Sequence, residues 1–549
     1  MKKWPPSLAA AIFALAALSL SPWGRSFPLN DDWTYALPVK NLLAHKGLRL
    51  YDTFHTQLLQ TAWGWLCGVP SGFSFGALTL STLCLGTAAV WLFSRLLLRL
   101  ELEPPAALLG AFCLAFNPLF FVLSFTFMTE IPYLFMLLLS VYLFTARSAE
   151  SRRSLWGASL GAAGATLIRP TGILLPPGLL PGLPGGPGRK LRGLLVLWLP
   201  ALAALACWWF WLRSVDATQV SGAASGIHSE AFRYWSRPLL LLAETLRRLA
   251  SGAVLCGLFL LPFSVFFISR PGFFSGLRGD RRALPAAAAV IILCGIYVLL
   301  AGRAPLPGAG NYIYRTGLGY VTIYGYSFKA SGILGSGSFW PLVSALSVLS
   351  AGVLAAEFSR LKDLPAPVRS CLLVFALQFG FVLAAPRFFD RYLLYALVPA
   401  LIAACAAARP FYFSVPVLAA AGALALFSWA GTGDYLAWNA AKWEAAYRSA
   451  GHGIAPADVA GGFDYDAWHN YEKRMAQLKQ ESAASFVGEW GWQDLPSKKA
   501  VVVFSPPPGL EGGVLERVAY RTPLAPFSRG SVYLIKLPAR AAADAKSGT

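Results

Sequence analysis

Long apolar stretches alternate with short polar ones along the first 430 residues of the chain. Many of these stretches contain about 20 residues, which is the length that an α-helix needs to cross a bilayer. The pattern therefore predicts a polytopic α-helical membrane protein with about 13 transmembrane helices. The predicted spans are residues 7–20, 73–97, 105–127, 130–146, 154–168, 171–186, 191–212, 246–269, 284–301, 339–357, 370–386, 391–408 and 410–430.

The first apolar run, 7–20, follows Met1-Lys2-Lys3 as it would in a signal peptide, but no small-residue cleavage site comes after it. We predict instead a transmembrane helix whose N-terminus lies in the cytoplasm. Residues 25–72 then form an outer loop. Within this loop the amphipathic stretch 34–46 is expected to lie along the membrane interface as a juxtamembrane helix.

The stretch 154–188 is too long for a single span, and Pro170 and Gly172 interrupt it just after Arg169. We predict two short helices with Arg169 at the outer turn between them, because a single helix would invert every later loop. With two helices, the basic clusters share one side of the membrane, which the positive-inside rule assigns to the cytoplasm of a bacterial inner (plasma) membrane. The clusters comprise Arg95, Arg99, Arg147, Arg152, Arg153, Arg189, Lys190, Arg192, Arg270, Arg278, Arg281, Arg282, Arg360, Lys362, Arg369 and Arg409.

The composition changes after residue 430. Residues 431–549 carry ordinary numbers of charged and turn residues, which predicts a small soluble α/β domain after a transmembrane catalytic domain over 1–430. The orientation places this second domain on the extracytoplasmic side. Its predicted helices are 440–450 and 466–485, and its predicted strands are 500–504, 515–520 and 531–537.

Charge and cysteine content narrow the functional classes. The chain has 46 Lys and Arg against 26 Asp and Glu, and its basic residues lie in short loops between apolar runs. Such loops face anionic lipids, so we predict membrane lipids and no nucleic acid as partners. Most of the eight Cys lie inside apolar runs without paired spacing, which argues against a disulfide framework or a zinc site.

Three carboxylates lie at predicted outer positions of a chain that is poor in acids. Asp31 and Asp32 follow the first span, and Glu130 begins the fourth. Each can be a helix cap or part of a solvated turn. Each can also be catalytic, since a carboxylate within hydrogen-bond reach of an acceptor hydroxyl acts as a general base. Adjacent carboxylates point in different directions, so only one of Asp31 and Asp32 is expected to be that base.

Basic residues on the same side supply candidate anion ligands. Arg387 and Arg391 are four residues apart and so share one helix face, and Arg169 lies at the outer turn. These arginines can bind lipid headgroups, pair with Asp390, or bind a substrate phosphate. Further candidates for substrate or phosphate binding are Lys40, His55 and, in the Gly- and Tyr-rich outer loop 302–338, Arg315. Acids and arginines on one side suit transfer from a phosphorylated lipid, because the arginines stabilise the leaving phosphate.

Four motifs carry a resemblance to a known family. They are Asp31-Asp32 after a single N-terminal helix, Thr129-Glu130-Ile131-Pro132, Leu167-Ile168-Arg169-Pro170-Thr171-Gly172, and Asp390-Arg391-Tyr392-Leu393-Leu394 with Pro399. With these four motifs in this order, the chain resembles the GT-C glycosyltransferases of the protein-mannosyltransferase (family 39) and aminoarabinose-transferase type. The resemblance implies a GT-C fold and an inverting transfer of a sugar from a polyprenyl-phosphate donor, usually undecaprenyl phosphate in bacteria. The acceptor, which can be a lipid, a glycan or a protein, lies outside.

The resemblance also implies that an aspartate of the first loop is the base. Many members have Asp-Glu there, whereas this chain has Asp-Asp, so Asp31 and Asp32 both stay candidates. Some GT-C enzymes use a divalent metal. Asp31, Asp32 and Glu130 could bind one, but we predict no metal ligand and no certain cofactor.

Two other functional classes stay open at this point. A transporter or flippase for lipid-linked saccharides would place ionisable residues in the middle of its helices, whereas most of them here lie at outer helix ends. A ligase or polymerase of such saccharides usually carries its catalytic residues in a large late outer loop, whereas here the acids come first.

Overall fold

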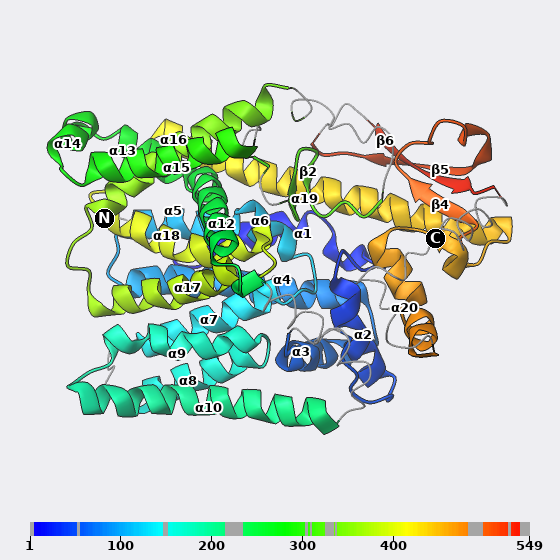
Figure 1. Cartoon of the computed structure of the whole chain (residues 1–549), viewed down its shortest axis with the longest axis horizontal. Coiled ribbons are helices and arrows are strands. Elements are labelled where there is room, and N and C mark those ends of the chain that lie inside the picture. The colour runs from blue at the N-terminus through cyan, green and yellow to red at the C-terminus, as the bar shows by residue number, and fades with distance from the viewer. Residues whose placement is uncertain are drawn as a thin grey trace.

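The structure is a computed structural model. It describes residues 5–51, 55–145, 152–214, 234–301, 306–307, 310–323, 334, 337–480, 498–524 and 529–538. Most of its long helices run along the longest axis of the molecule, and a small sheet lies at one end of them (Figure 1). The predicted fold class, a polytopic helical membrane protein with a small sheet region near its C-terminus, is confirmed.

The first part of the chain folds into short and long apolar helices. Its α-helices are α1 (Leu8–Leu18), α2 (Asp32–Leu43), α3 (Leu58–Gly68), α4 (Phe75–Arg99), α5 (Pro104–Ala115), α6 (Pro118–Leu123), α7 (Glu130–Phe144), α8 (Arg152–Thr166), α9 (Leu175–Gly178) and α10 (Pro187–Ser214). Its 3-10 helices are η1 (Pro22–Gly24), η2 (Pro170–Leu174) and η3 (Leu180–Gly182).

The second part adds further helices. Its α-helices are α12 (Pro238–Phe259), α13 (Leu261–Ile268), α14 (Phe273–Gly279), α15 (Ala283–Ala301), α16 (Phe339–Ser359), α17 (Ala366–Ala384), α18 (Leu394–Ala407), α19 (Val415–Arg448) and α20 (Phe463–Gln480). Its 3-10 helices are η5 (Asp390–Leu393), η6 (Ser449–His452), η7 (Pro456–Asp458) and η10 (Glu511–Gly513).

By length and composition, seven helices in the described part of the chain can cross a membrane, or eight if the bent pair α12 and α13 is one span. Three shorter apolar helices, α1, α5 and α7, also coincide with predicted spans. The prediction of a multi-pass membrane protein is therefore confirmed. The total of about 13 spans stays a prediction.

The predicted interruption after residue 168 is confirmed. Helix α8 ends at Thr166, and the chain then continues through η2, α9 and η3 rather than through one regular helix. Prolines explain the irregularity, because Pro170, Pro176 and Pro177 lack the N–H group that a helix interior requires. Arg169 consequently lies at a helix end, where its side chain can reach neighbouring segments.

Helix α2 covers most of the predicted juxtamembrane stretch 34–46, and it is buried continuously from Asp32 to Val39. Helix α3 exposes Trp65 and Leu66. The location of 34–46 along the membrane interface stays a prediction. Burial of α2 matters for function because Asp31 is its N-cap residue and Asp32 its first.

A four-stranded sheet lies near the C-terminus, in the order β3 (Val459–Ala460), β4 (Ala500–Val503), β6 (Arg529–Lys536), β5 (Val514–Arg521). Strand β4 pairs with β6 in the antiparallel register Ala500↔Lys536, and β3 pairs with β4 in parallel. The three predicted strands are thus confirmed. Strand β3 and the hairpin of β1 (Ile313–Tyr314) and β2 (Gly317–Leu318) were missed because two-residue strands leave no alternating pattern.

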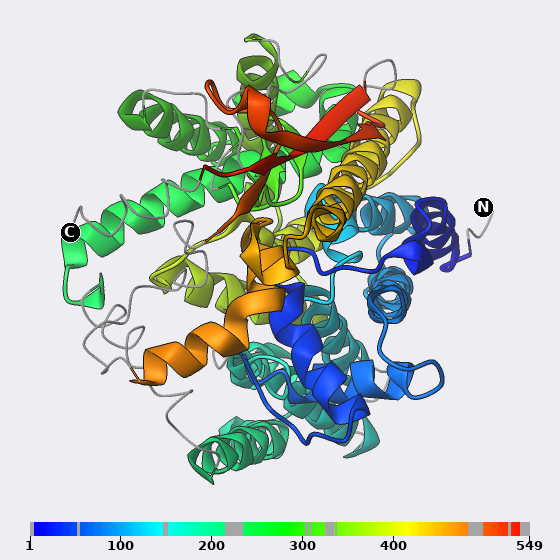
Figure 2. The same ribbon diagram turned by 90° about the vertical axis from the view of Figure 1, so that its right-hand side faces the viewer.

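Helix α19 joins the membrane part to the sheet. The predicted span 410–430 and the predicted helix 440–450 are one helix of 34 residues, so the predicted domain boundary at 430 falls inside it. Figure 2 shows α19 running beneath the sheet, with α20 and α2 side by side next to it. The division into two domains stays a prediction, and the two parts share a continuous helix.

Helices α12 and α16 cross in close contact at Gly257. A Cβ atom there would collide with the backbone oxygen of Ser347. The Ser350 hydroxyl donates to the Gly257 carbonyl at 2.6 Å and contacts the Ser264 hydroxyl at 2.7 Å. Small and hydroxyl-bearing residues are typical of such crossings, since they let two backbones approach within a bilayer.

We predict that Gly257→Ala lowers the free energy of unfolding by about 1–3 kcal/mol, because the new methyl group forces the two helices apart. Gly295→Ala on α15 is the matched control, since nothing lies within 4 Å of a Cβ atom at that position. Thermal unfolding of the two purified variants in detergent measures the difference. Equal melting temperatures would show that this crossing is not a tight one.

Candidate active site

A buried ion pair joins two of the predicted motifs. Arg169 Nη2 lies 2.6 Å from Glu130 Oε1, and the exposed fractions of the two side chains are 7% and 1%. Arg169 also donates to the Thr129 hydroxyl from Nε at 2.8 Å and to the Tyr395 hydroxyl from Nη1 at 2.9 Å. The guanidinium is therefore held from three directions, which fixes it where α8 ends and α7 begins.

A second arginine shares the same carboxylate. Arg391 Nε lies 3.2 Å from Glu130 Oε1, and Arg391 Nη1 lies 3.0 Å from Asp31 Oδ2. Asp31, Arg391, Glu130 and Arg169 thus form a continuous array of alternating charges from four separate parts of the chain. Asp31 is its most accessible member, since 27% of its side chain is exposed against 7% of that of Arg391.

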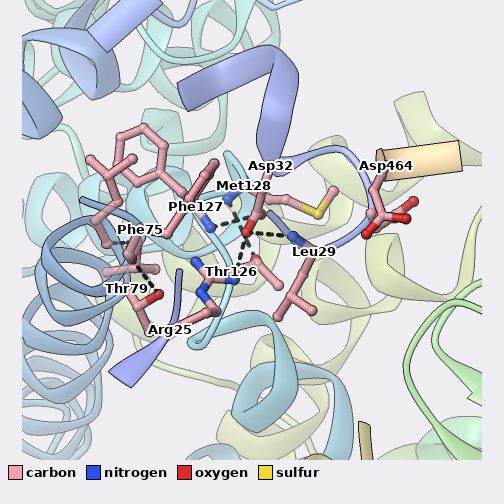
Figure 3. A network of polar contacts seen from close by, with 12 residues as sticks. Arg25, Leu29, Asp32, Phe75, Thr79, Thr126, Phe127, Met128 and Asp464 are labelled. Atoms are coloured by element: carbon pink, nitrogen blue, oxygen red, sulfur yellow. Dashed lines mark hydrogen bonds and ion pairs between the residues drawn. The ribbon is translucent and has the colours of Figure 1, made fainter. Parts of the chain in front are cut away.

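The neighbouring Asp32 has a different environment. Its side chain is fully buried, and Oδ2 lies 2.8 Å from Arg25 Nη1 and accepts the Leu29 N–H at 3.2 Å. Its Oδ1 accepts the Phe127 N–H at 2.8 Å (Figure 3). Burial raises the pKa of Asp32 to about 6 against the opposing effect of Arg25, so the carboxylate is mostly ionised at neutral pH. Asp32 therefore ties the loop before α2 to the segment before α7.

Asp390 connects the outer loop 302–338 to this array. Its Oδ2 accepts three successive backbone N–H groups, from Asn311 at 3.2 Å and from Tyr312 and Ile313 at 2.8 Å each. The Tyr312 hydroxyl in turn donates to Met128 Sδ at 2.9 Å. This loop segment thus lies against the residues that precede Glu130. Of the predicted loop 302–338, the structure describes residues 306–307, 310–323, 334 and 337–338.

The weaker candidates lie at or beyond the edge of the array. His55 contacts Tyr35 of α2 at 3.1 Å and interacts electrostatically with Glu130, so it lies nearby. Lys40 instead lies over the ring of Trp468 in α20, 4.5 Å from its centroid. Arg387 and Arg315 have exposed side chains.

The three carboxylates are not arranged as ligands of a cation. Asp31 lies against Arg391, Asp32 against Arg25, and Glu130 against both Arg169 and Arg391. In the described part of the chain, no three His, Cys, Asp or Glu side chains lie together as a metal site requires. The donor set therefore does not fit a divalent ion, and the predicted lack of a metal ligand stays a prediction.

Several residues of the site were not identified from the sequence. Arg25, Thr129, Tyr312 and Tyr395 each form a hydrogen bond with a charged side chain that the sequence analysis named, namely Asp32, Arg169, Asp390 and Arg169. Thr129 belongs to a motif that the sequence did single out. Arg25 could have been suspected, because an arginine just outside the first span and next to an acid pair needs a partner.

One protein-family model matches part of the chain. The family model described as dolichyl-phosphate-mannose-protein mannosyltransferase matches residues 68–212. That family consists of glycosyltransferases, and the match confirms the predicted resemblance over this part of the chain. No curated protein matches the chain by sequence.

Three of the solved structures that match the chain illustrate how distant these matches are. ArnT from Cupriavidus metallidurans, bound to undecaprenyl phosphate, is 13% identical over 96% of this chain and 97% of its own, with a TM-score of 0.41. The Saccharomyces cerevisiae Pmt1–Pmt2 complex with its sugar donor is 14% identical over 40% of this chain and 35% of that one, with a TM-score of 0.31. The Archaeoglobus fulgidus oligosaccharyltransferase in its apo form is 16% identical over 79% and 56%, with a TM-score of 0.37.

We predict that Asp32→Asn lowers the free energy of unfolding by about 3–5 kcal/mol, because it leaves the buried Arg25 charge uncompensated. Asp31→Asn is the matched control, since Asp31 is partly exposed and Arg391 keeps Glu130 as a partner. Thermal unfolding and the amount of each variant in the membrane measure the effect. If both variants unfold at the same temperature, Asp32 is not the structural carboxylate.

Proposed function

We propose that this protein, whose residues 68–212 match a family of protein mannosyltransferases, is an integral-membrane glycosyltransferase. It moves a sugar from a polyprenyl-phosphate donor to an acceptor with inversion at the anomeric carbon. The acceptor is a lipid, a glycan or a protein on the extracytoplasmic side of a bacterial inner membrane. The N-terminus lies in the cytoplasm, and the C-terminal region lies on the side of the active site.

The observation that carries this proposal is the array Asp31–Arg391–Glu130–Arg169. Two guanidinium groups lie at one buried carboxylate, and a more accessible carboxylate lies at the end of the array. Arginine donors in an environment of low dielectric bind phosphate more strongly than they would in water. A sugar donor with a phosphate leaving group supplies the anion that such a pair of arginines accommodates.

Glu130 has a positioning role in this proposal. It contacts both arginines through Oε1 and so prevents them from separating under their mutual repulsion. The arginines then stabilise the charge that develops on the phosphate oxygen as its bond to the sugar breaks. Fixed donors need no reorganisation at the moment of reaction.

Asp31 is the base in this proposal. When the donor binds, its phosphate replaces Asp31 as the partner of Arg391 Nη1, and Asp31 can then turn to the acceptor hydroxyl. The acceptor oxygen attacks the anomeric carbon, the bond from that carbon to the phosphate oxygen breaks, and the acceptor proton goes to Asp31. Polyprenyl phosphate leaves with the electron pair. Asp32 cannot serve, because its two oxygens are buried and already accept Arg25 and two backbone N–H groups.

We predict that Asp31→Asn reduces transfer from a labelled polyprenyl-phosphate sugar by about 100-fold or more, since a general base contributes 10²–10⁴-fold. The purified variant, reconstituted with donor and acceptor, is compared with wild type for the rate of label transfer. Glu444→Gln, which removes an exposed ion pair of α19, is the control and is expected to keep wild-type activity.

Full activity of Asp31→Asn would contradict the assignment of the base. A wild-type protein that transfers no sugar from any polyprenyl-phosphate donor would contradict the proposed function itself. Since the control variant carries the same number of substitutions, it shows whether an activity loss follows from handling rather than from Asp31.

A further inference from the structure

A second buried ion pair lies outside the array just described. Lys442 of α19 and Asp464 in the first turn of α20 are both fully buried, and Lys442 Nζ lies 2.6 Å from each carboxylate oxygen of Asp464. Lys442 also donates to the Thr322 hydroxyl at 2.9 Å, and Trp443 Nε1 donates to Asp464 at 3.3 Å. Removing one member of such a pair leaves a buried charge without compensation.

The first turn of α20 is also held from another direction. Asp466 lies 3.2 Å from Lys498, and both side chains are 4% exposed. Lys498 Nζ in addition donates to the Ala457 carbonyl at 2.8 Å. Two acids, two residues apart, thus fix the start of α20 to α19 and to the segment that precedes β4.

One face of α20 packs against α2. Phe463, Ala467 and Tyr471 are spaced four residues apart and so share this face. The Phe463 and Tyr471 rings lie 6.2 Å and 5.0 Å from the ring of Trp33. Trp33 forms a small hydrophobic cluster with Phe463 and Ala467, which also includes Leu37 of α2.

Trp468 of α20 contacts both α2 and the segment just before α4. Its ring stacks on Phe73 at 5.9 Å, and Lys40 of α2 lies over it at 4.5 Å from the centroid. The sequence predicted Lys40 as a candidate for substrate or phosphate binding. In the structure Lys40 contacts Trp468, and this contact attaches α20 to α2.

Helix α2 begins next to the proposed base. Asp31 is its N-cap residue, and Trp33 follows two positions later. On one side α2 is fixed by Asp32 through Arg25 and the Phe127 N–H. On the side of Trp33 and Leu37 it is covered by α20. Helix α2 thus begins at Asp31 and packs against α20, whose start is held by Lys442–Asp464 and by Asp466–Lys498.

We infer that the Lys442–Asp464 ion pair is a positioning device, which docks α20 on α2 and thereby orients Asp31 for the transfer reaction. This inference rests on the proposed function, and it gives the C-terminal region a role in catalysis without contact with substrate. A displacement of about 1 Å at a reacting group can cost about 100-fold in rate, so a modest shift of α2 is sufficient to be measured.

The test compares three variants of the full-length protein. Asp464→Asn breaks the pair, Lys442→Met/Asp464→Leu replaces both charges by apolar groups, and Tyr471→Ala removes a half-buried contact with Trp33. We expect Asp464→Asn and Tyr471→Ala to lower kcat by about tenfold or more and to leave the KM for the polyprenyl-phosphate donor within about twofold. The double variant is expected to keep kcat within about threefold of wild type, since such pairs are often replaceable by apolar residues.

Hydrogen exchange of residues 31–43 separates positioning from simple instability. In Asp464→Asn and Tyr471→Ala the exchange is expected to rise in α2, with the number of donor-binding sites per protein unchanged. If the Asp464→Asn protein does not accumulate, the Tyr471→Ala variant tests the inference instead. Tyr471 belongs to the same contact between α20 and α2, and its side chain is only half-buried. Glu444→Gln, on the exposed face of α19, is the control for both measurements.

The inference is overturned if wild-type kcat persists in Tyr471→Ala and Asp464→Asn, or if donor binding falls in proportion to kcat. Hydrogen exchange in residues 31–43 that stays at the wild-type level in Asp464→Asn and Tyr471→Ala also overturns it. Failure of the proposed function is a separate outcome, because it appears as a lack of transfer in the wild-type protein itself.

Discussion

The candidate site depends on one constraint, the burial of Arg391 between two carboxylates. A guanidinium that is 7% exposed must be neutralised, and Glu130 and Asp31 both contribute. Glu130 is already paired with Arg169, so the two arginines and two acids form a balanced group. Such balance stabilises the buried group of charges. The contact between Asp31 and Arg391 is the most accessible of the group, and in the proposed function it is the one that the donor phosphate replaces.

The fold brings these four residues together through interruptions of its helices. Arg169 follows the end of α8, Glu130 begins α7, Arg391 lies in η5 before α18, and Asp31 precedes α2. Helix ends can carry charged side chains, because the unpaired backbone groups there are polar and the neighbouring segment can bend. The prolines after Arg169 and the capping contacts of Asp390 with residues 311–313 therefore serve the site as much as the fold.

The sequence predicted the members of the site better than their roles. Apolar runs of the length of a membrane span predicted the helices. Charges at the ends of these runs predicted Asp31, Glu130, Arg169 and Arg391 as site residues, because charged residues near a bilayer are rare and often functional. Asp31 and Asp32 could not be distinguished, since their difference arises from Arg25 and the Phe127 N–H, which approach only in the folded chain. The contact of Lys40 with Trp468 could not be predicted for the same reason, because Trp468 lies more than 400 residues further along the chain. The long helix α19 was divided in the prediction because its apolar pattern changes where it passes from the membrane part to the sheet.

The central claim is that Asp31 and the donor phosphate compete for Arg391, and equilibrium binding of undecaprenyl phosphate tests it most directly. In Arg391→Met the affinity is expected to fall by roughly 10- to 100-fold, which corresponds to the loss of a charge-assisted hydrogen bond. In Asp31→Asn the affinity is expected to rise, because the phosphate no longer displaces a carboxylate. Weaker binding in Asp31→Asn, or unchanged binding in Arg391→Met, would contradict the account.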